Sequence, residues 1–315
     1  MAVDPSHVNP LDCEEVSADC PVKASIYGYY PILGWNAFFS VVFGLCFFFN
    51  FWLGLRYRTW TYALAMCFAC VASCIGYIGR VLMHDNPFDQ LGFQIQICAL
   101  TMSPAFNAAA LYLILKHLVL LFGRECSRIR PKYYTWLFIF VDFLALSLQA
   151  AGGGIAGSAG DNASFRDVGD RLMITGISWQ VLTLLLFAIV AADYFARRFR
   201  SPQPLSEKAA AVLKDTRFKI FAAAVMIVYV TILIRCVYRI AEMAGGWRNP
   251  IMQDQPLFIG VDSWMVAIAT VLQTFVHPGI FFPFLCRRKG KKESKTSDTE
   301  NRDDTSSDSV GKSVI

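Results

Sequence analysis

Long apolar blocks separated by short polar segments make up the chain from residue 32 to residue 286. Each block has roughly 20 or more residues, which is the length that a helix needs to cross the ~30 Å hydrocarbon core of a bilayer. The blocks do not alternate apolar and polar residues, as the strands of a membrane barrel would. Because a bilayer core holds no water to satisfy backbone polar groups, each block must be helical. The predicted spans are Ile32–Gly54, Trp60–Leu82, Phe93–Leu121, Tyr133–Gly153, Leu172–Tyr194, Phe218–Met243 and Phe258–Cys286.

The composition supports an all-α membrane protein built as a seven-transmembrane helix bundle. Of the 315 residues, 55% are hydrophobic and 17% are charged, whereas a soluble domain carries about 25% charged residues. Residues 1–22 are polar and acidic and contain no apolar stretch of the kind found in a cleavable signal peptide. We therefore expect the first span to act as the insertion signal.

Basic residues gather in alternate connecting segments. By the positive-inside rule, these segments face the cytosol, which places the N-terminus outside and the C-terminus in the cytosol. The predicted organisation is an extracellular segment (1–30), a transmembrane domain (31–286) and a disordered cytosolic tail (287–315). The net charge of +5 is then a topology signal and does not indicate binding to nucleic acid. The cytosolic basic residues are Arg56, Arg58, Arg124, Arg128, Arg130, Lys132, Arg197, Arg198, Arg200, Lys208, Lys214, Arg217, Lys219, Arg287, Arg288, Lys289, Lys291 and Lys292.

Several positions outside the spans are candidates for modification. Asn162 begins a glycosylation sequon in the longest outside loop. Cys13 and Cys20 lie in the outside segment, where they form either a disulfide or two unpaired thiols. Cys286, at the cytosolic edge, is a candidate for palmitoylation. The basic start of the tail suits the anionic headgroups of the inner leaflet.

Polar residues inside the spans are the main candidates for function, because a charge at mid-bilayer costs ~2.5 kcal/mol or more. Arg235, Arg239 and Glu242 are spaced to share one helix face. They and the other candidates concentrate toward the outside, which predicts a polar cavity opening to the outer leaflet. The alternative is a set of interhelical ion pairs that only fixes packing. The candidate substrate-binding residues are Arg80, Gln96, Asp142, Gln149, Gln180, Arg235, Arg239, Glu242 and Asp262.

The arginine fork suits phosphate or carboxylate. We expect Arg235 to pair with Glu242 or Asp262, which would leave Arg239 freer to meet a cargo headgroup.

Glycine and proline predict local irregularities. Gly152-Gly153-Gly154 is expected to end the fourth span in a flexible loop, because glycine permits backbone geometries closed to other residues. Pro104 and Pro278 are expected to kink the third and seventh spans.

Motifs from about Tyr29 to Pro283 resemble, in order, those of the fungal lipid-translocating exporter family. The resemblance implies a seven-helix transporter, and members of that family confer resistance to aminocholesterol or export sphingoid bases. Ser73 and Gln255 stand where the family often carries glutamate, which makes this site richer in arginine than in acids. The matching motifs are Tyr29-Tyr30-Pro31, Gly76-Tyr77-Ile78-Gly79-Arg80, Gln149-Ala150-Ala151-Gly152-Gly153-Gly154, Arg235-Cys236-Val237-Tyr238-Arg239-Ile240-Ala241-Glu242 and His277-Pro278-Gly279.

The favoured function is translocation of an amphipathic lipid or hydrophobic toxin, giving efflux or stress tolerance. The alternative is a seven-helix receptor, or a lipid or stress sensor, that signals through its cytosolic loops. An enzyme is not expected, because the chain has no phosphate-binding G-x-x-x-x-G-K-[ST] loop and its four histidines form no metal-binding cluster. We expect no cofactor, and membrane lipids and an amphipathic small-molecule cargo as partners. The expected location is the plasma membrane, with the vacuole or another endomembrane as the alternative.

Overall fold

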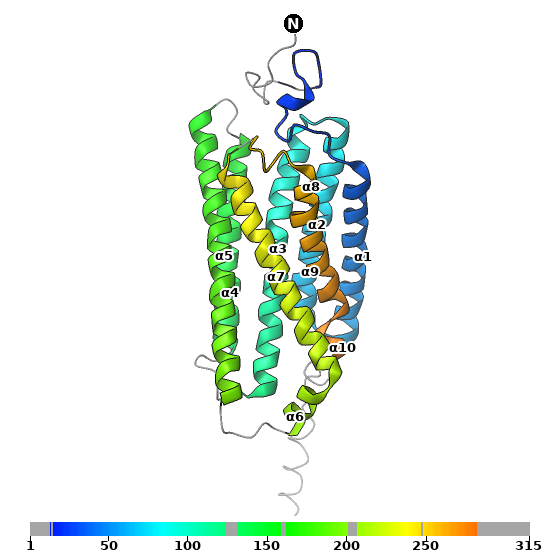
Figure 1. Cartoon of the computed structure of the whole chain (residues 1–315), viewed down its shortest axis with the longest axis vertical. Coiled ribbons are helices and arrows are strands. Elements are labelled where there is room, and N and C mark those ends of the chain that lie inside the picture. Colours follow the sequence, from blue (N-terminus) through cyan, green and yellow to red (C-terminus); the bar gives the residue numbers. More distant parts are fainter. Residues whose placement is uncertain are drawn as a thin grey trace, which may run out of the picture.

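The computed structural model describes residues 13, 15–123, 131–158, 162–200, 207–246 and 248–281. Within these ranges every regular element is a helix, and seven helices are long and apolar enough to cross a membrane, as predicted (Figure 1). The first six are α1 (Leu33–Tyr57), α2 (Trp60–Asp85), α3 (Gln90–Phe122), α4 (Pro131–Ser158), α5 (Ala163–Arg200) and α7 (Thr216–Ala244). The seventh is a succession of α8 (Gln255–Leu257), the π-helix η2 (Phe258–Ser263), α9 (Trp264–Phe275) and α10 (Pro278–Phe281). Two short helices, η1 (Val22–Ala24) and α6 (Glu207–Lys214), lie outside the spans.

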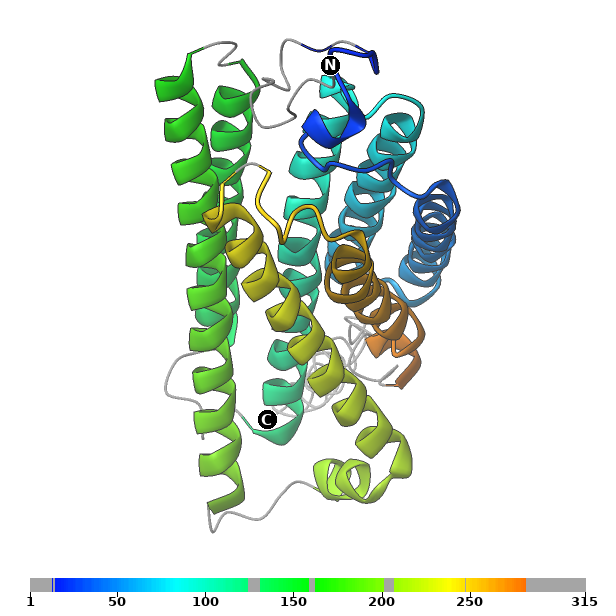
Figure 2. The ribbon, with the colours of Figure 1, turned by 45° about the horizontal axis from the view of Figure 1, so that its top comes forward.

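Helix α3 lies at the centre of the bundle. In its most apolar stretch 67% of residues are buried, against 33% in α1 and in α4. Helix α2 packs between α1 and α3, and α4 pairs along its length with α5. Helix α7 crosses the bundle obliquely and contacts α9, α5 and α3 (Figures 1 and 2). This crossing brings the polar face of α7 against α3 and the seventh span.

The outward faces of the bundle are apolar. Phe48, Trp52, Trp136 and Ile189 are each at least 60% exposed. Soluble monomers do not present large apolar side chains over a whole surface. Lipid chains satisfy such a surface, so the exposed residues agree with the membrane assignment made from the sequence.

The two ends of the bundle differ. The N-terminal segment with its Cys13–Cys20 disulfide covers one end, which is termed the disulfide end (Figure 1). The exposed Asn162, the sequon residue, follows α4 at the same end, where the Gln94 amide of α3 donates to the Gly157 carbonyl. Cys286 and the basic tail lie outside the described residues.

The glycine triplet does not form the flexible loop that we expected. Gly152, Gly153 and Gly154 lie within α4. A Cβ on Gly152 would lie 2.6 Å from the carbonyl oxygen of Gly169 on α5. Small residues of this kind let membrane helices approach closely. The membrane also forces the backbone to bond within its own helix, and this outweighs the poor helix propensity of glycine.

Replacing Gly152 with alanine should therefore destabilise the protein by about 1–3 kcal/mol through overpacking between α4 and α5. The matched control is Gly154→Ala, two residues away on the same helix, where an added Cβ would meet nothing within 4 Å. That control should be neutral or should stabilise by up to about 1 kcal/mol. Thermal unfolding of the detergent-purified variants measures both effects. Equal melting temperatures for the two variants would contradict the assigned role of Gly152.

The prolines behave differently from each other. Pro104 lies inside α3, which continues as a helix on both sides of it, and the kink expected there stays a prediction. Before Pro278 the seventh span is interrupted at Val276 and His277, between α9 and α10. The break agrees with the irregularity predicted at Pro278, because proline clashes with a continuing helix.

Candidate functional site

Five charged side chains meet inside the bundle toward the disulfide end. They are Arg80 of α2, Arg235, Arg239 and Glu242 of α7, and Asp262 of η2. Each of these residues is at most 1% exposed. We call these five residues the charge cluster. The sequence spacing of Arg235, Arg239 and Glu242 predicted that they share one face of a helix. In the structure that face of α7 points into the bundle.

Arg239 is the most heavily paired member of the charge cluster. Its Nη1 donates to Glu242 Oε2 at 2.7 Å, and its Nε lies 3.1 Å from Asp262 Oδ1. The expectation that Arg239 is the freer arginine is therefore wrong. The oblique crossing of α7 places its guanidinium between the two acids, so one fork serves both.

Arg235 pairs with Asp262, which is one of the two partners that we expected. Its Nε lies 3.4 Å from Asp262 Oδ1. Its Nη2 also donates to the Leu100 carbonyl of α3 at 2.5 Å. The arginines of α7 thus hold both acids of the cluster and fasten α7 to α3 and η2.

Arg80 has no acidic partner within 4 Å among the described residues. Its Nη2 donates to Tyr29 Oη at 3.0 Å. Its guanidinium carbon lies 5.0 Å from the ring centre of Tyr27 and 4.0 Å from that of Phe258. Its Nε and Nη1 have no hydrogen-bond partner in the described part of the chain. With three arginines and two acids, the cluster has one surplus positive charge, and Arg80 carries it.

The segment 21–32 closes the cluster at the disulfide end, and we call it the roof. Tyr27 is 1% exposed and accepts a hydrogen bond from Gln96 Nε2 at 2.8 Å. Gly28 has φ of +70°, a left-handed conformation that glycine adopts freely. Tyr27 and Tyr29 on either side of it both reach Arg80.

Burial raises the pKa of Tyr27 far above that of free tyrosine. Its phenol is therefore neutral at physiological pH, and it does not act as the counter-ion of Arg80.

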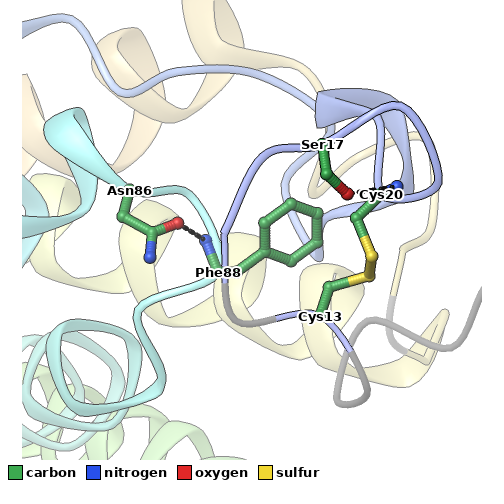
Figure 3. Close-up of a disulfide and its surroundings, with 5 residues drawn as sticks. All are labelled: Cys13, Ser17, Cys20, Asn86 and Phe88. Carbon is green, nitrogen blue, oxygen red and sulfur yellow. Dashed lines mark hydrogen bonds between the residues drawn. A yellow bond between two sulfur atoms is a disulfide. The ribbon is translucent and has the colours of Figure 1, made fainter.

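The N-terminal disulfide holds the chain that precedes the roof against the α2–α3 turn. Cys13 and Cys20 are bonded, with their Cα atoms 5.9 Å apart, so the paired alternative from the sequence is the one observed. The two cysteines pack with Ala24 and the ring of Phe88 (Figure 3). The backbone N–H of Phe88 donates to Asn86 Oδ1 at 3.0 Å. The five residues of the charge cluster are buried beneath the roof, whereas the sequence predicted a cavity open to the outer leaflet.

The π-helix η2 presents two residues to the charge cluster. Phe258 faces Arg80 and lies 5.7 Å from the guanidinium carbon of Arg239, while Asp262 pairs with Arg235 and Arg239. Single π turns inside α-helical segments occur frequently at functional sites. The sequence analysis did not identify Phe258 or Tyr27, because aromatic residues near span ends are ordinary in membrane helices. Tyr29 stood out only as part of a family motif.

The other predicted site residues form two separate contacts. Asp142 accepts a hydrogen bond from Tyr112 Oη at 2.8 Å and makes no ion pair with the described residues, and its Oδ1 has no hydrogen-bond partner there. Gln149 Nε2 donates to Gln180 Oε1 at 3.3 Å between α4 and α5. The structure therefore groups six of the predicted residues at the disulfide end. Those six are Arg80, Gln96, Arg235, Arg239, Glu242 and Asp262.

An apolar cavity of about 250 Å³ lies apart from the charge cluster, between the ends of α3, α5, α6 and α7. Phe122, Phe195, Phe199, Leu213 and Phe218 contribute to its lining. In the part of the chain that the structure describes, no three His, Cys, Asp or Glu side chains are grouped as ligands for a metal ion.

Comparisons with known proteins identify one matching family model and several named relatives. The family model described as RTA1 like protein matches residues 66–284. The sphingoid long-chain base transporter RSB1 of Saccharomyces cerevisiae is 28% identical over 298 residues, which cover 86% of this chain and 76% of the relative. The lipid-translocating exporter-like protein RTA1 of Leptosphaeria maculans is 22% identical over 298 residues, 88% of this chain and 55% of the relative.

A third relative is named as an uptake protein. Protoporphyrin uptake protein 1 of Saccharomyces cerevisiae is 28% identical over 213 residues, which cover 65% of this chain and 66% of the relative. No solved structure matches the chain.

Proposed function

We infer, from the premise that this chain belongs to the family described as RTA1 like protein, that it moves an amphipathic lipid or hydrophobic toxin across the bilayer. Relatives are named as a sphingoid long-chain base transporter and a lipid-translocating exporter-like protein. The chain is a multi-pass integral membrane protein. We place it in the plasma membrane, acting in efflux or stress tolerance and without catalytic chemistry. The basic start of the tail would contact anionic lipids of the inner leaflet.

The charge cluster is the observation that carries this function. A headgroup needs polar partners inside the membrane, and its tail or ring system needs an apolar surface. The cluster places three arginines and two acids inside a bundle whose outward faces are apolar. Closure by the roof shuts the site at one end, as one state of a transporter with alternating access requires. The shut state must then alternate with a state in which Tyr27 and Tyr29 have moved away from Arg80.

We propose that the disulfide end faces the cell exterior. The disulfide and the exposed sequon residue Asn162 both lie at this end, and disulfides persist in oxidising compartments. An epitope at the C-terminus should then resist protease added to intact cells, while an epitope at residue 162 is removed. Removal of the C-terminal epitope under these conditions would show that the orientation is the opposite of the proposed one.

Transport is tested with purified protein in lipid vesicles. Fluorescent analogues of a long-chain base, a phospholipid and a sterol amine are placed in one leaflet, and their movement to the other leaflet is measured by quenching. We expect at least one analogue to cross faster than in protein-free vesicles. If no analogue moves faster, while a lipid ligand changes the coupling of the protein to a G-protein reporter in cells, a receptor replaces the transporter.

A further inference from the structure

We propose that Arg80 binds an anionic group of the cargo, a phosphate or a carboxylate carried on a lipid. The inference rests on the proposed transport function and adds the chemical class of the headgroup. The ring of Phe258, whose centre lies 4.0 Å from the guanidinium carbon, holds Arg80 in place for this role.

The charge balance of the cluster leads to this assignment. Glu242 and Asp262 are both paired to the α7 arginines, so those four groups are neutral together. Arg80 is fully buried and has no acid within 4 Å among the described residues. A guanidinium does not lose its proton in a protein, so the charge stays. Facing rings stabilise it in part, but an anion balances it fully.

The unused donors at the site also fit an anion. Of the five N–H donors of the Arg80 guanidinium, one is used by Tyr29, and Nε and Nη1 have no partner in the described part of the chain. Several donors on one buried surface match the several oxygens of a phosphate or a carboxylate.

Two unused acceptors near Arg80 indicate which other groups the headgroup carries. Glu242 Oε1 and Asp262 Oδ2 each have no hydrogen-bond partner among the described residues. Because both carboxylates are already ion-paired, they attract a lone cation weakly. They can still accept from a hydroxyl or amine that lies beside the anionic group. The site therefore fits an anionic group with neighbouring donors better than a simple amine.

The test measures both binding and movement in the protein vesicles for a matched pair of lipids, a long-chain base and its 1-phosphate, which differ only in the phosphate. Inorganic phosphate is the third probe. Wild-type protein should bind the 1-phosphate about tenfold or more tightly than the base, the scale of a strong charge-assisted contact. Arg80→Gln should lose this preference, and Arg80→Lys should keep part of it. The matched control is Arg197→Gln, which removes an exposed arginine paired with Asp193 on α5 and should leave the preference for the 1-phosphate unchanged.

A second measurement does not depend on the folding of any variant. Each probe is added to wild-type protein in detergent, and the melting temperature is recorded. The 1-phosphate should raise it more than the base does, because a ligand that binds only the folded state stabilises it.

Three results decide the matter. If the base stabilises wild-type protein more than the 1-phosphate does, and Arg80→Gln transports it normally, the anionic assignment is overturned while transport stands. If inorganic phosphate binds as tightly as the 1-phosphate, the site takes a free anion and the lipid assignment is overturned. If no lipid probe moves in any vesicle, the proposed function itself has failed.

Discussion

Replacing Arg239 with glutamine should lower the free energy of unfolding by about 3–5 kcal/mol, the cost of leaving buried charges without their partner. Arg239 contacts both acids of the charge cluster, and all three side chains are at most 2% exposed. Asp262 keeps only the longer contact to Arg235, at 3.4 Å. Denaturant or thermal unfolding of detergent-purified protein measures the loss, together with surface expression in cells.

A double variant separates the charge effect from lost packing. In the double variant Arg239→Gln/Glu242→Gln, the Glu242 carboxylate that would lose its partner Arg239 is replaced by a neutral amide. Part of the stability lost in Arg239→Gln should therefore return. The two changes should therefore cost less together than the sum of the single variants, as expected for residues in direct contact. Arg197→Gln, in an exposed pair with Asp193 at 3.0 Å, should cost about 0.2–1 kcal/mol. Additive losses from Arg239→Gln and Glu242→Gln would show that the ion pair does not stabilise the fold.

Arg239→Lys asks a narrower question. Lysine keeps the charge but has no planar fork, so it can hold one acid well and not both. We expect a stability between those of wild type and Arg239→Gln. Arg239 is a structural partner of Glu242 and Asp262, and the headgroup role predicted for it is the one that we propose for Arg80.

The seven-helix architecture followed from the sequence because apolar length is a direct physical signal. Each span had to be helical and of bilayer length, whatever its neighbours. The inward face of α7 was also predictable, since Arg235, Arg239 and Glu242 recur at helical spacing. Their choice of partners was not, because it depends on the oblique crossing of α7 and on the π turn at Phe258–Ser263. Neither feature leaves a local pattern in the sequence.

The role of the N-terminal segment was also beyond the sequence. Tyr27 and Tyr29 precede the first span, and nothing in their spacing shows that the chain folds back over α2 and α3. The disulfide was left open for a similar reason, since two cysteines seven residues apart can pair or stay free. The glycine triplet was misread because local propensity favours a loop there. Packing against Gly169 decides the conformation instead.

Asp142 provides the contrast to Arg239, because it is a buried acid without an ionic partner among the described residues. Its only hydrogen bond there comes from Tyr112. Asparagine has nearly the same shape, and its amide oxygen can still accept from that hydroxyl. Since an unpaired charge is costly in the bilayer, Asp142→Asn should unfold at the same or a slightly higher free energy than wild type. The second carboxyl oxygen, Oδ1, has no hydrogen-bond partner among the described residues and is then available for cargo.

Transport should fall in Asp142→Asn by roughly tenfold or more, since a hydrogen bond to a charged group contributes about 1.5–3 kcal/mol. The matched control is Tyr112→Phe, which keeps the carboxylate and removes its donor. That variant should lose about 1–3 kcal/mol of stability, because it leaves the buried acceptor without a partner. The readouts are surface expression, unfolding and lipid movement in vesicles, measured on the same preparations. If surface expression and transport fall together in Asp142→Asn, Asp142 is a packing residue of α4. The carboxylate then has no part in moving the cargo.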